Sequence, residues 1–195
     1  TAYNPPEYRS YIEGAGYAKA MDWYAYMLDT ATLGGGASDK LPPKLLRTVE
    51  IARRRSGATF RKVRMSEFTR ELERVRQIYN RAWERNYSFV PMDDAEIDYM
   101  AASLKSILDP DLVFMAEVGG QPVGVSITLP DYNQVLKSIN GRLLPFGWLK
   151  VLLGRSKIDT ARVFAMGIVP EYRKRGIDAV FYYETFREGV RKGYQ

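Results

Sequence analysis

Apolar and polar positions recur in a regular order from residue 59 onwards. Residues 59–65 show partial alternation, which predicts a strand, and residues 66–86 and 94–108 show helical spacing of apolar side chains. Ser66 and Asp93 or Asp94 are the expected N-caps of these two helices. The apolar stretches 112–118 and 121–129 flank Gly119-Gly120, a pattern typical of a β-hairpin. A strand at 161–169 and a helix from 177 to about 192 complete the order.

The first 57 residues are less regular. Over residues 1–30 we expect a short helix, a turn at Gly14-Ala15-Gly16 and a strand; the alternative is an extension whose aromatic side chains pack on the body. Residues 33–38 have the composition of a turn or linker. A helix is predicted over 44–55, after Pro42-Pro43, and Gly57 ends it. The expected division is therefore 1–32 as an extension, 33–57 as linker and helix, and 58–195 as the main domain.

The segment 135–154 is rich in both apolar and basic residues and interrupts this order. One interpretation is a loop with a short helix that covers the core. The other is a lid or wall of a binding pocket.

The stretch with the clearest chemistry follows the strand at 161–169. Arg173, Lys174 and Arg175 precede Gly176, and a helical pattern begins directly afterwards. Main-chain N–H groups at a helix start lack intrahelical partners, and the helix dipole adds partial positive charge there. Glycine permits a positive φ or a close backbone approach. This combination of strand, basic turn and helix start predicts a phosphate site.

The same residues resemble the cofactor loop of the GNAT N-acetyltransferases. That loop reads Gln/Arg-x-x-Gly-x-Gly/Ala after a strand, and here it reads Arg173-Lys174-Arg175-Gly176-Ile177-Asp178. Asp178 departs from the pattern: it either repels a pyrophosphate or serves as a helix N-cap. The order strand, helix, helix, strand, strand, strand, helix over 59–193 also resembles the first part of the GNAT fold. The expected fold class is thus α/β, with a mixed GNAT-like sheet.

The resemblance implies acetyl-CoA as cosubstrate and an amine as acceptor, either a small molecule or a peptide. By position, Met166, Gly167 and Ile168 would contact the pantetheine arm. The loop residues Arg173, Lys174, Arg175, Gly176, Ile177 and Asp178 would hold the pyrophosphate. The catalytic candidates are Glu117 as a base and Tyr132 beside the acceptor. Asn86, Tyr87 and Asn133 are further candidates for acceptor contacts.

The chain has no cysteine and no histidine. This excludes disulfides, thiolate nucleophiles, imidazole bases and Cys/His zinc sites, and no metal is expected. A general base must then be Asp, Glu, Tyr or Lys. The net charge of +6 admits an anionic partner. The basic cluster at residues 53–55, 61, 62 and 64 is better explained as solvated surface than as a nucleic-acid site. The absence of a long apolar run predicts a cytoplasmic protein without a membrane partner.

A complete GNAT domain would continue beyond this chain with another strand, a helix and two more strands. Without them the strand at 161–169 keeps an unpaired edge, which sheets avoid. Three interpretations stay open: a fragment of a larger bacterial protein with tandem GNAT domains, residues 1–30 folding back, or pairing with another chain, such as a homodimer through that edge. The alternative function is a GNAT-like module without catalysis that serves as a structural or partner-binding domain.

Overall fold

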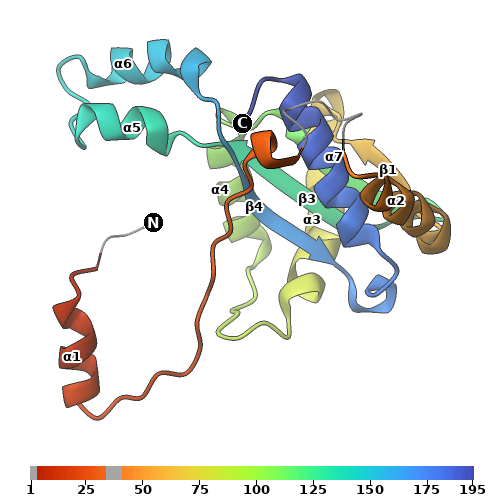
Figure 1. Ribbon diagram of the computed structural model, residues 1–195, viewed down its shortest axis with the longest axis horizontal. Coiled ribbons are helices and arrows are strands. Elements are labelled where there is room, and N and C mark those ends of the chain that lie inside the picture. Colours follow the sequence, from red (N-terminus) through yellow and green to blue (C-terminus); the bar gives the residue numbers. More distant parts are fainter. Residues whose placement is uncertain (1–3, 34–40) are drawn as a thin grey trace.

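The fold is built on one antiparallel sheet of four strands in the order β1-β2-β3-β4. The computed structural model describes residues 4–33 and 41–195 (Figure 1). The strands are β1 (Thr59–Lys62), β2 (Val113–Val118), β3 (Gln121–Pro130) and β4 (Ala161–Ile168). Neighbours in the sheet are therefore neighbours in the sequence, and within the described residues the outer edge of β4 has no strand beside it.

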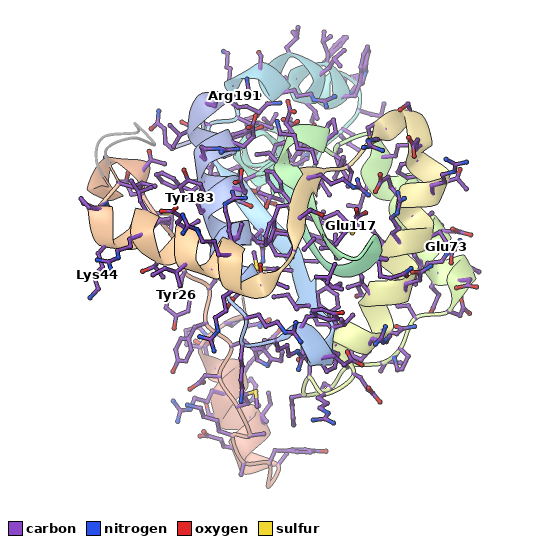
Figure 2. The ribbon with its side chains drawn as sticks, turned by 90° about the vertical axis from the view of Figure 1, so that its right-hand side faces the viewer. Tyr26, Lys44, Glu73, Glu117, Tyr183 and Arg191 are labelled. Carbon is purple, nitrogen blue, oxygen red and sulfur yellow. The ribbon has the colours of Figure 1, made fainter. Side chains whose placement is uncertain are left out.

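Helices cover both faces of the sheet. On one face lie α3 (Phe68–Trp83) and α4 (Asp94–Lys105), which close over Val113 and Ile127. On the other face lies α7 (Ile177–Arg191), and α2 (Pro43–Ser56) packs against α7 from outside (Figure 2). The pairing of Val125 with Gly167, and of Gly124 with Ile168, sets which side chains face each layer.

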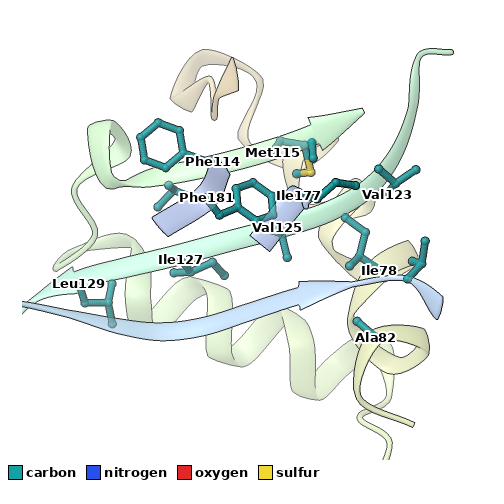
Figure 3. Packing of buried hydrophobic residues seen from close by; sticks show 13 residues of the cluster. Ile78, Ala82, Phe114, Met115, Val123, Val125, Ile127, Leu129, Ile177 and Phe181 are labelled. Carbon is teal, nitrogen blue, oxygen red and sulfur yellow. The ribbon is translucent and has the colours of Figure 1, made fainter. Parts of the chain in front are cut away.

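The core fills the space between the sheet and these helices (Figure 3). Met115 and Val125 belong to the same buried cluster as Ile78 of α3. Phe181 of α7 lies edge-on to Phe60, with ring centroids 5.7 Å apart. A smaller cluster of Val49, Ala52 and Val180 joins α2 to α7. Because α7 packs against both the sheet and α2, it is held on two sides, and this fixes the direction of its N-terminal end.

Several local predictions are confirmed. Gly119 and Gly120 both have positive φ, as a two-residue hairpin turn requires. Asp93 accepts a hydrogen bond from the Glu96 N–H at 2.8 Å, and the Glu96 carboxylate accepts one from the Asp93 N–H, which is a complete capping box. Gly57 ends α2 in the left-handed conformation.

Other local predictions are wrong. Ser66 is not a helix N-cap: it lies in the short 3₁₀ helix η3 (Met65–Glu67), and α3 begins two residues later without a side-chain cap. The first strand ends at Lys62, earlier than predicted. The helix α7 buries the apolar side chains of Ile177, Val180 and Phe181, and also the two acidic residues Glu184 and Glu188. The contacts of α7 on two sides explain this, since two faces of the helix are covered.

The N-terminal region contains α1 (Glu7–Gly14), a turn at Gly16 and the short η1 (Thr30–Leu33). The helix and the glycine turn are as predicted. The predicted strand is wrong: residues 17–29 have no regular structure and their side chains are almost all exposed. They run outside the body and add no strand to the sheet (Figure 1). A strand needs a neighbouring strand for its N–H and C=O groups, and none of the four strands in the described part of the chain pairs with this segment. The predicted linker at 33–38 lies largely outside the described residues.

The insertion forms a pair of short helices, α5 (Asn133–Ile139) and α6 (Gly147–Gly154), followed by η5 (Arg155–Lys157). Val135 and Ile139 of α5 are buried, but α6 buries no residue. The pair stands off the sheet and its helical layers (Figure 1). The prediction of a single core-covering helix is therefore wrong.

The remaining connections are the 3₁₀ helices η4 (Pro110–Leu112), before β2, and η6 (Pro170–Tyr172), after β4. The complete order from residue 59 is β1, α3, α4, β2, β3, β4, α7, with the α5–α6 pair inserted before β4. This is the predicted order of elements, and the predicted α/β class is confirmed, although every strand pair described is antiparallel.

Candidate functional site

The basic turn lies where a strand meets a helix start. β4 ends at Ile168, η6 follows, and residues 173–176 turn directly into α7. Lys174 has φ of 60° and Gly176 has φ of 87°, so the backbone passes twice through the left-handed region within three residues. Alternation of this kind turns successive N–H groups toward a common side, which favours binding of an anion.

Gly176 is required here for two reasons. Its positive φ is one that side chains rarely adopt, and a Cβ at this position would stand 2.6 Å from the Cβ of Ala52 on α2. Both explanations that the sequence suggested for this glycine are therefore correct, although the close approach is to a helix of the protein itself.

The main-chain donors of the turn are available. Among the described residues, no group accepts a hydrogen bond from the N–H of residues 174–178. The amide of Val180 already bonds to the carbonyl of Gly176 at 3.2 Å, so the regular helix ladder begins there. The turn and the first turn of α7 together present donors without partners, at the positive end of the helix dipole.

The side chain of Arg173 is used by the protein itself. Its Nη2 donates to the carbonyl of Ala82 at 2.6 Å, and its Nε donates to the carbonyl of Ile168 at 3.2 Å. These bonds tie the turn to the C-terminal end of α3 and to the end of β4. Arg173 thus fixes the position of the turn, while the cation next to it in sequence, Lys174, lines the open cavity.

A cavity of about 390 Å³ opens between the end of α3, the outer edge of β4 and the start of α7. It brings together the expected arm residues Met166, Gly167 and Ile168 with the loop residues Arg173, Lys174 and Asp178. Asn86, an expected acceptor contact, lines it as well. Residues widely separated in the sequence therefore meet in one site at the free edge of the sheet.

Three lining residues escaped the sequence analysis: Ala82, Trp83 and Tyr182. Trp83 packs against Gly167, where a Cβ would stand 2.4 Å from the ring. The only signal was a tryptophan in the last turn of a helix otherwise rich in charge, and that pattern has no special spacing. Tyr182 follows Asp178 by one helical turn, so its place on the cavity side could have been found from the helix period.

Other predicted loop residues do not line the cavity. Ile177 is fully buried in the core, and the Arg175 guanidinium lies over the Tyr172 ring, 4.5 Å from its centroid. Gly176 faces α2. If these residues contribute to binding, it is through the main chain and not through their side chains.

Asp178 is not a helix N-cap, because Gly176 occupies that position and no side chain caps α7. Asp178 instead lines the cavity, as Lys174 does. An acid in the first turn of a helix is favourable to the helix dipole. The same charge repels an anion that enters the cavity. Asp178 is therefore favourable for the helix and unfavourable for binding of a pyrophosphate.

The two catalytic candidates lie outside this cavity. Glu117 forms ion pairs with Arg61 at 2.7 Å and with Arg74 at 3.7 Å, beside α3 (Figure 2). Arg61 also pairs with the buried Glu71 at 2.8 Å, so these groups form one ion-pair cluster. Glu117 therefore holds β2 against β1 and α3, whereas a base would need access to the acceptor.

Tyr132 lies at the start of α5, with its ring beside the guanidinium of Arg155. Its hydroxyl is buried and has no hydrogen-bond partner among the described residues. Asn133 binds the carboxylate of Asp131, and Tyr87 is exposed in the loop after α3. None of these three lines the cavity, so their predicted roles toward an acceptor rest on the sequence alone.

Most of the basic cluster at residues 53–64 is neutralised by acidic partners. Arg53 pairs with Glu184, Lys62 with Asp111 and Glu188, and Arg64 with Glu67. Hydrogen bonds from Lys192 and Lys62 lower the pKa of Asp111 from 3.8 to about 2. Cations held in this way are poorly placed to bind phosphates, and the cluster instead ties β1 to α7.

The described residues contain no group of three or more acids that could hold a metal ion. In the same part of the chain, no helix has the length and apolar character needed to cross a bilayer.

No protein-family model matches the chain. Among curated proteins it is similar to the bacterial ceramide synthase of Caulobacter vibrioides, with 35% identity over 83% of this chain. It is also similar to Protein YghO of Escherichia coli K12, with 32% identity over 88% of this chain. These alignments cover 41% and 42% of the two relatives, so the chain spans about two fifths of the length of the curated relatives it matches.

The solved structures that align with this chain include N-acetyltransferases. An agmatine N-acetyltransferase aligns with 71% of this chain and 73% of its own, at 13% identity and a TM-score of 0.44. Arylalkylamine N-acetyltransferase 2 of Aedes aegypti aligns over the same shares, at 14% identity and a TM-score of 0.42.

Proposed function

We propose that this chain, whose order of strands and helices resembles that of the GNAT N-acetyltransferases and which is similar in sequence to a bacterial ceramide synthase, is the cofactor-binding part of an acyl-CoA-dependent N-acyltransferase. One observation carries the proposal. The amides of residues 174–178 have no acceptor among the described residues, and the turn that holds them borders a cavity at the free edge of β4.

Different residues of the cavity suit different parts of a CoA thioester. The free amides and the Lys174 ammonium would hold the pyrophosphate, as a helix start and a nearby cation do for phosphates generally. Met166, Gly167 and Ile168, at the open edge of β4, would lie along the pantetheine arm. Arg173 would keep the turn in place through the carbonyls of Ala82 and Ile168. The thioester supplies an activated acyl group, which an amine can attack directly.

The donor that the sequence resemblance implies is acetyl-CoA. A second candidate is a longer acyl group, because the relative with 35% identity is named a ceramide synthase. A ceramide is an amide between a fatty acid and a long-chain amino alcohol, so its formation is also an N-acyl transfer. Both candidates share the same pyrophosphate site and differ only in the length of the acyl chain on the thioester.

Binding of CoA to the purified chain tests the proposal. At a ligand concentration of 100 Kd we expect stabilisation of about 2.7 kcal/mol in a thermal or chemical melt. CoA should protect, and pantetheine, which lacks the pyrophosphate, should not. Lys174→Gln should weaken CoA binding, whereas Lys44→Gln, the same charge change on the exposed side of α2, should not. Absence of any shift with CoA would contradict the proposal.

Comparing acetyl-CoA with a long-chain acyl-CoA then separates the two donors. If the acyl chain finds apolar contacts beyond the thioester, the long-chain donor should bind more tightly than CoA itself. If it does not, the two thioesters should bind alike.

The alternative is a GNAT-like module without catalysis. Asp178 favours it, because a carboxylate beside the phosphate site opposes an anion, and Glu117 is engaged in ion pairs. A chain that binds neither CoA nor its thioesters would support this alternative.

A further inference from the structure

The α5–α6 pair has an unusual outer surface. Its large apolar side chains are exposed: Leu143 55%, Leu144 80%, Phe146 68%, Trp148 53%, Leu152 62% and Leu153 66%. α6 itself is apolar around most of its circumference, yet none of its residues is buried. In water such a helix is normally covered by other parts of a protein or by lipid.

The charge of the segment has one sign. Residues 133–158 contain the cations Lys137, Arg142, Lys150, Arg155 and Lys157 and no acidic residue at all. Elsewhere in the described chain, many cations are paired with acids, as Arg61 is with Glu71 and Glu117. The absence of acids here leaves a positive surface around the apolar one.

The pair is also built as a firm unit. Gly154 packs so closely on α5 that a Cβ there would stand 2.7 Å from Val135 Cγ1. A Cβ at Gly147 would stand 1.9 Å from the carbonyl oxygen of Arg142, which closes the loop between the helices. The Trp148 indole donates to the carbonyl of Pro145 at 3.0 Å. The exposed side chains are thus presented by a folded scaffold and not by a loose loop.

We propose that the α5–α6 pair binds the surface of a bilayer containing anionic phospholipids. Leucines and aromatic residues on a short basic helix insert at the boundary of headgroups and acyl chains, while lysine and arginine meet the lipid phosphates. Tryptophan is enriched at that boundary. The charge complementarity favours an anionic lipid surface over a protein surface. The proposal departs from the expectation that the protein has no membrane partner. That expectation rested on the absence of a long apolar run, and a helix that lies on the bilayer surface needs no such run.

The proposal is independent of CoA binding, because neither CoA nor an amine takes part in its test. The purified chain is sedimented with vesicles of phosphatidylglycerol and phosphatidylethanolamine, and separately with vesicles of phosphatidylcholine alone. We expect binding to the anionic vesicles, little to the neutral ones, and release at high salt, since the screening length shortens to about 3 Å at 1 M.

Matched variants locate the contact. The double variant Leu152→Glu/Leu153→Glu should bind anionic vesicles with an affinity at least roughly tenfold lower, because it removes apolar contacts and adds negative charge. Lys150→Glu/Lys157→Glu should weaken binding to anionic vesicles only. Met27→Glu, a change at a position 90% exposed on the N-terminal segment, should have no effect. All these positions are exposed, so circular dichroism should show unchanged folding.

The chain has no cysteine, which allows a single label to be placed at will. An environment-sensitive fluorophore at Leu152→Cys should shift to the blue on anionic vesicles. The same label at Tyr99→Cys, which is 78% exposed on α4, should not. Failure to bind anionic vesicles, or equal binding by Leu152→Glu/Leu153→Glu, would overturn the proposal. A third result would also overturn it: the parent chain self-associates in ultracentrifugation, the double variant does not, and neither binds vesicles. The surface would then be a protein interface.

Discussion

The indole ring of Trp83 covers the main chain of Gly167 so closely that a Cβ at position 167 would stand 2.4 Å from its Cη2 atom. Trp83 ends α3 and Gly167 lies in β4, so this contact joins a helix to the strand that borders the candidate site. The ring is also part of the cavity wall. The shape of the cavity therefore depends on one residue having no side chain.

Gly167→Ala should displace the Trp83 ring and destabilise the chain by about 1–3 kcal/mol, as overpacking generally does. Chemical denaturation gives the free energy of unfolding. Trp83→Leu in the same background offers a smaller, more flexible neighbour and should restore part of the loss. If Gly167→Ala alone is as stable as the parent chain, the packing described between these two residues is incorrect.

Gly176→Ala should cost more than Gly57→Ala. Both glycines have positive φ, 87° and 64°, but of the two only Gly176 has a close neighbour, the Cβ of Ala52 at 2.6 Å. Gly57→Ala measures the strain of the left-handed backbone, about 1 kcal/mol. The additional loss at Gly176, by the same denaturation measurement, reports the clash with α2. Equal losses of unfolding free energy in the two variants would show that α2 moves aside without destabilising the chain.

Asp178→Asn should change stability and CoA affinity in opposite directions. Removing an acid from the first turn of α7 forfeits about 0.3–1 kcal/mol of interaction with the helix dipole. It also removes a negative charge from the cavity wall, so CoA should bind several-fold more tightly. Calorimetric titration with CoA measures the second effect. Weaker binding by the variant would mean that the carboxylate contacts the ligand favourably.

Acid should weaken the tie between β1 and α7. Hydrogen bonds from Lys192 and Lys62 hold the pKa of Asp111 at about 2 against an ordinary 3.8, so the folded state binds fewer protons than the unfolded one. The stability that Asp111 contributes is full above about pH 4 and is lost as the pH falls toward 2. For a side chain 37% exposed this amounts to about 1 kcal/mol after solvent screening.

Glu188 has a lowered pKa as well. Burial alone would raise it, but hydrogen bonds from Arg191 and Lys62 outweigh that effect. It therefore shifts stability in the same direction as Asp111. Denaturation between pH 6 and 2, compared for the parent chain and Asp111→Asn, measures the contribution, and the exposed Glu84→Gln serves as control. Parallel pH curves for parent and Asp111→Asn would contradict this assignment.

The sequence predicted most of the fold, because its strands and helices carry clear periodicities and their boundaries carry clear signals. Asp93 with Glu96, and Gly119-Gly120, are local patterns whose geometry depends on few neighbours. The prediction failed where tertiary contacts determine which side chains are buried. α7 is covered on two sides, so Glu184 and Glu188 are buried against cations that no local pattern reveals.

The candidate site was predicted in its main-chain part only. The strand, basic turn and glycine of residues 166–178 are contiguous, and their chemistry follows from the order of residues. Trp83 comes from another element, and its place over Gly167 depends on how α3 crosses β4. Glu117 looked available because its partners, Arg61 in β1 and Arg74 in α3, lie far away in the sequence.

β4 does not offer a uniform outer edge. Its pairing with β3 shifts between Ile127 and Thr128, whose partners are Ala165 and Val163, so Phe164 is left over as an extra residue. Such a bulge bends the strand and interrupts the even spacing of its free hydrogen-bonding groups. A strand of another molecule that paired with this edge could keep its hydrogen-bonding register only as far as Phe164. The edge of β4 is therefore interrupted along its length, and edges of this kind are less suited to edge-to-edge aggregation.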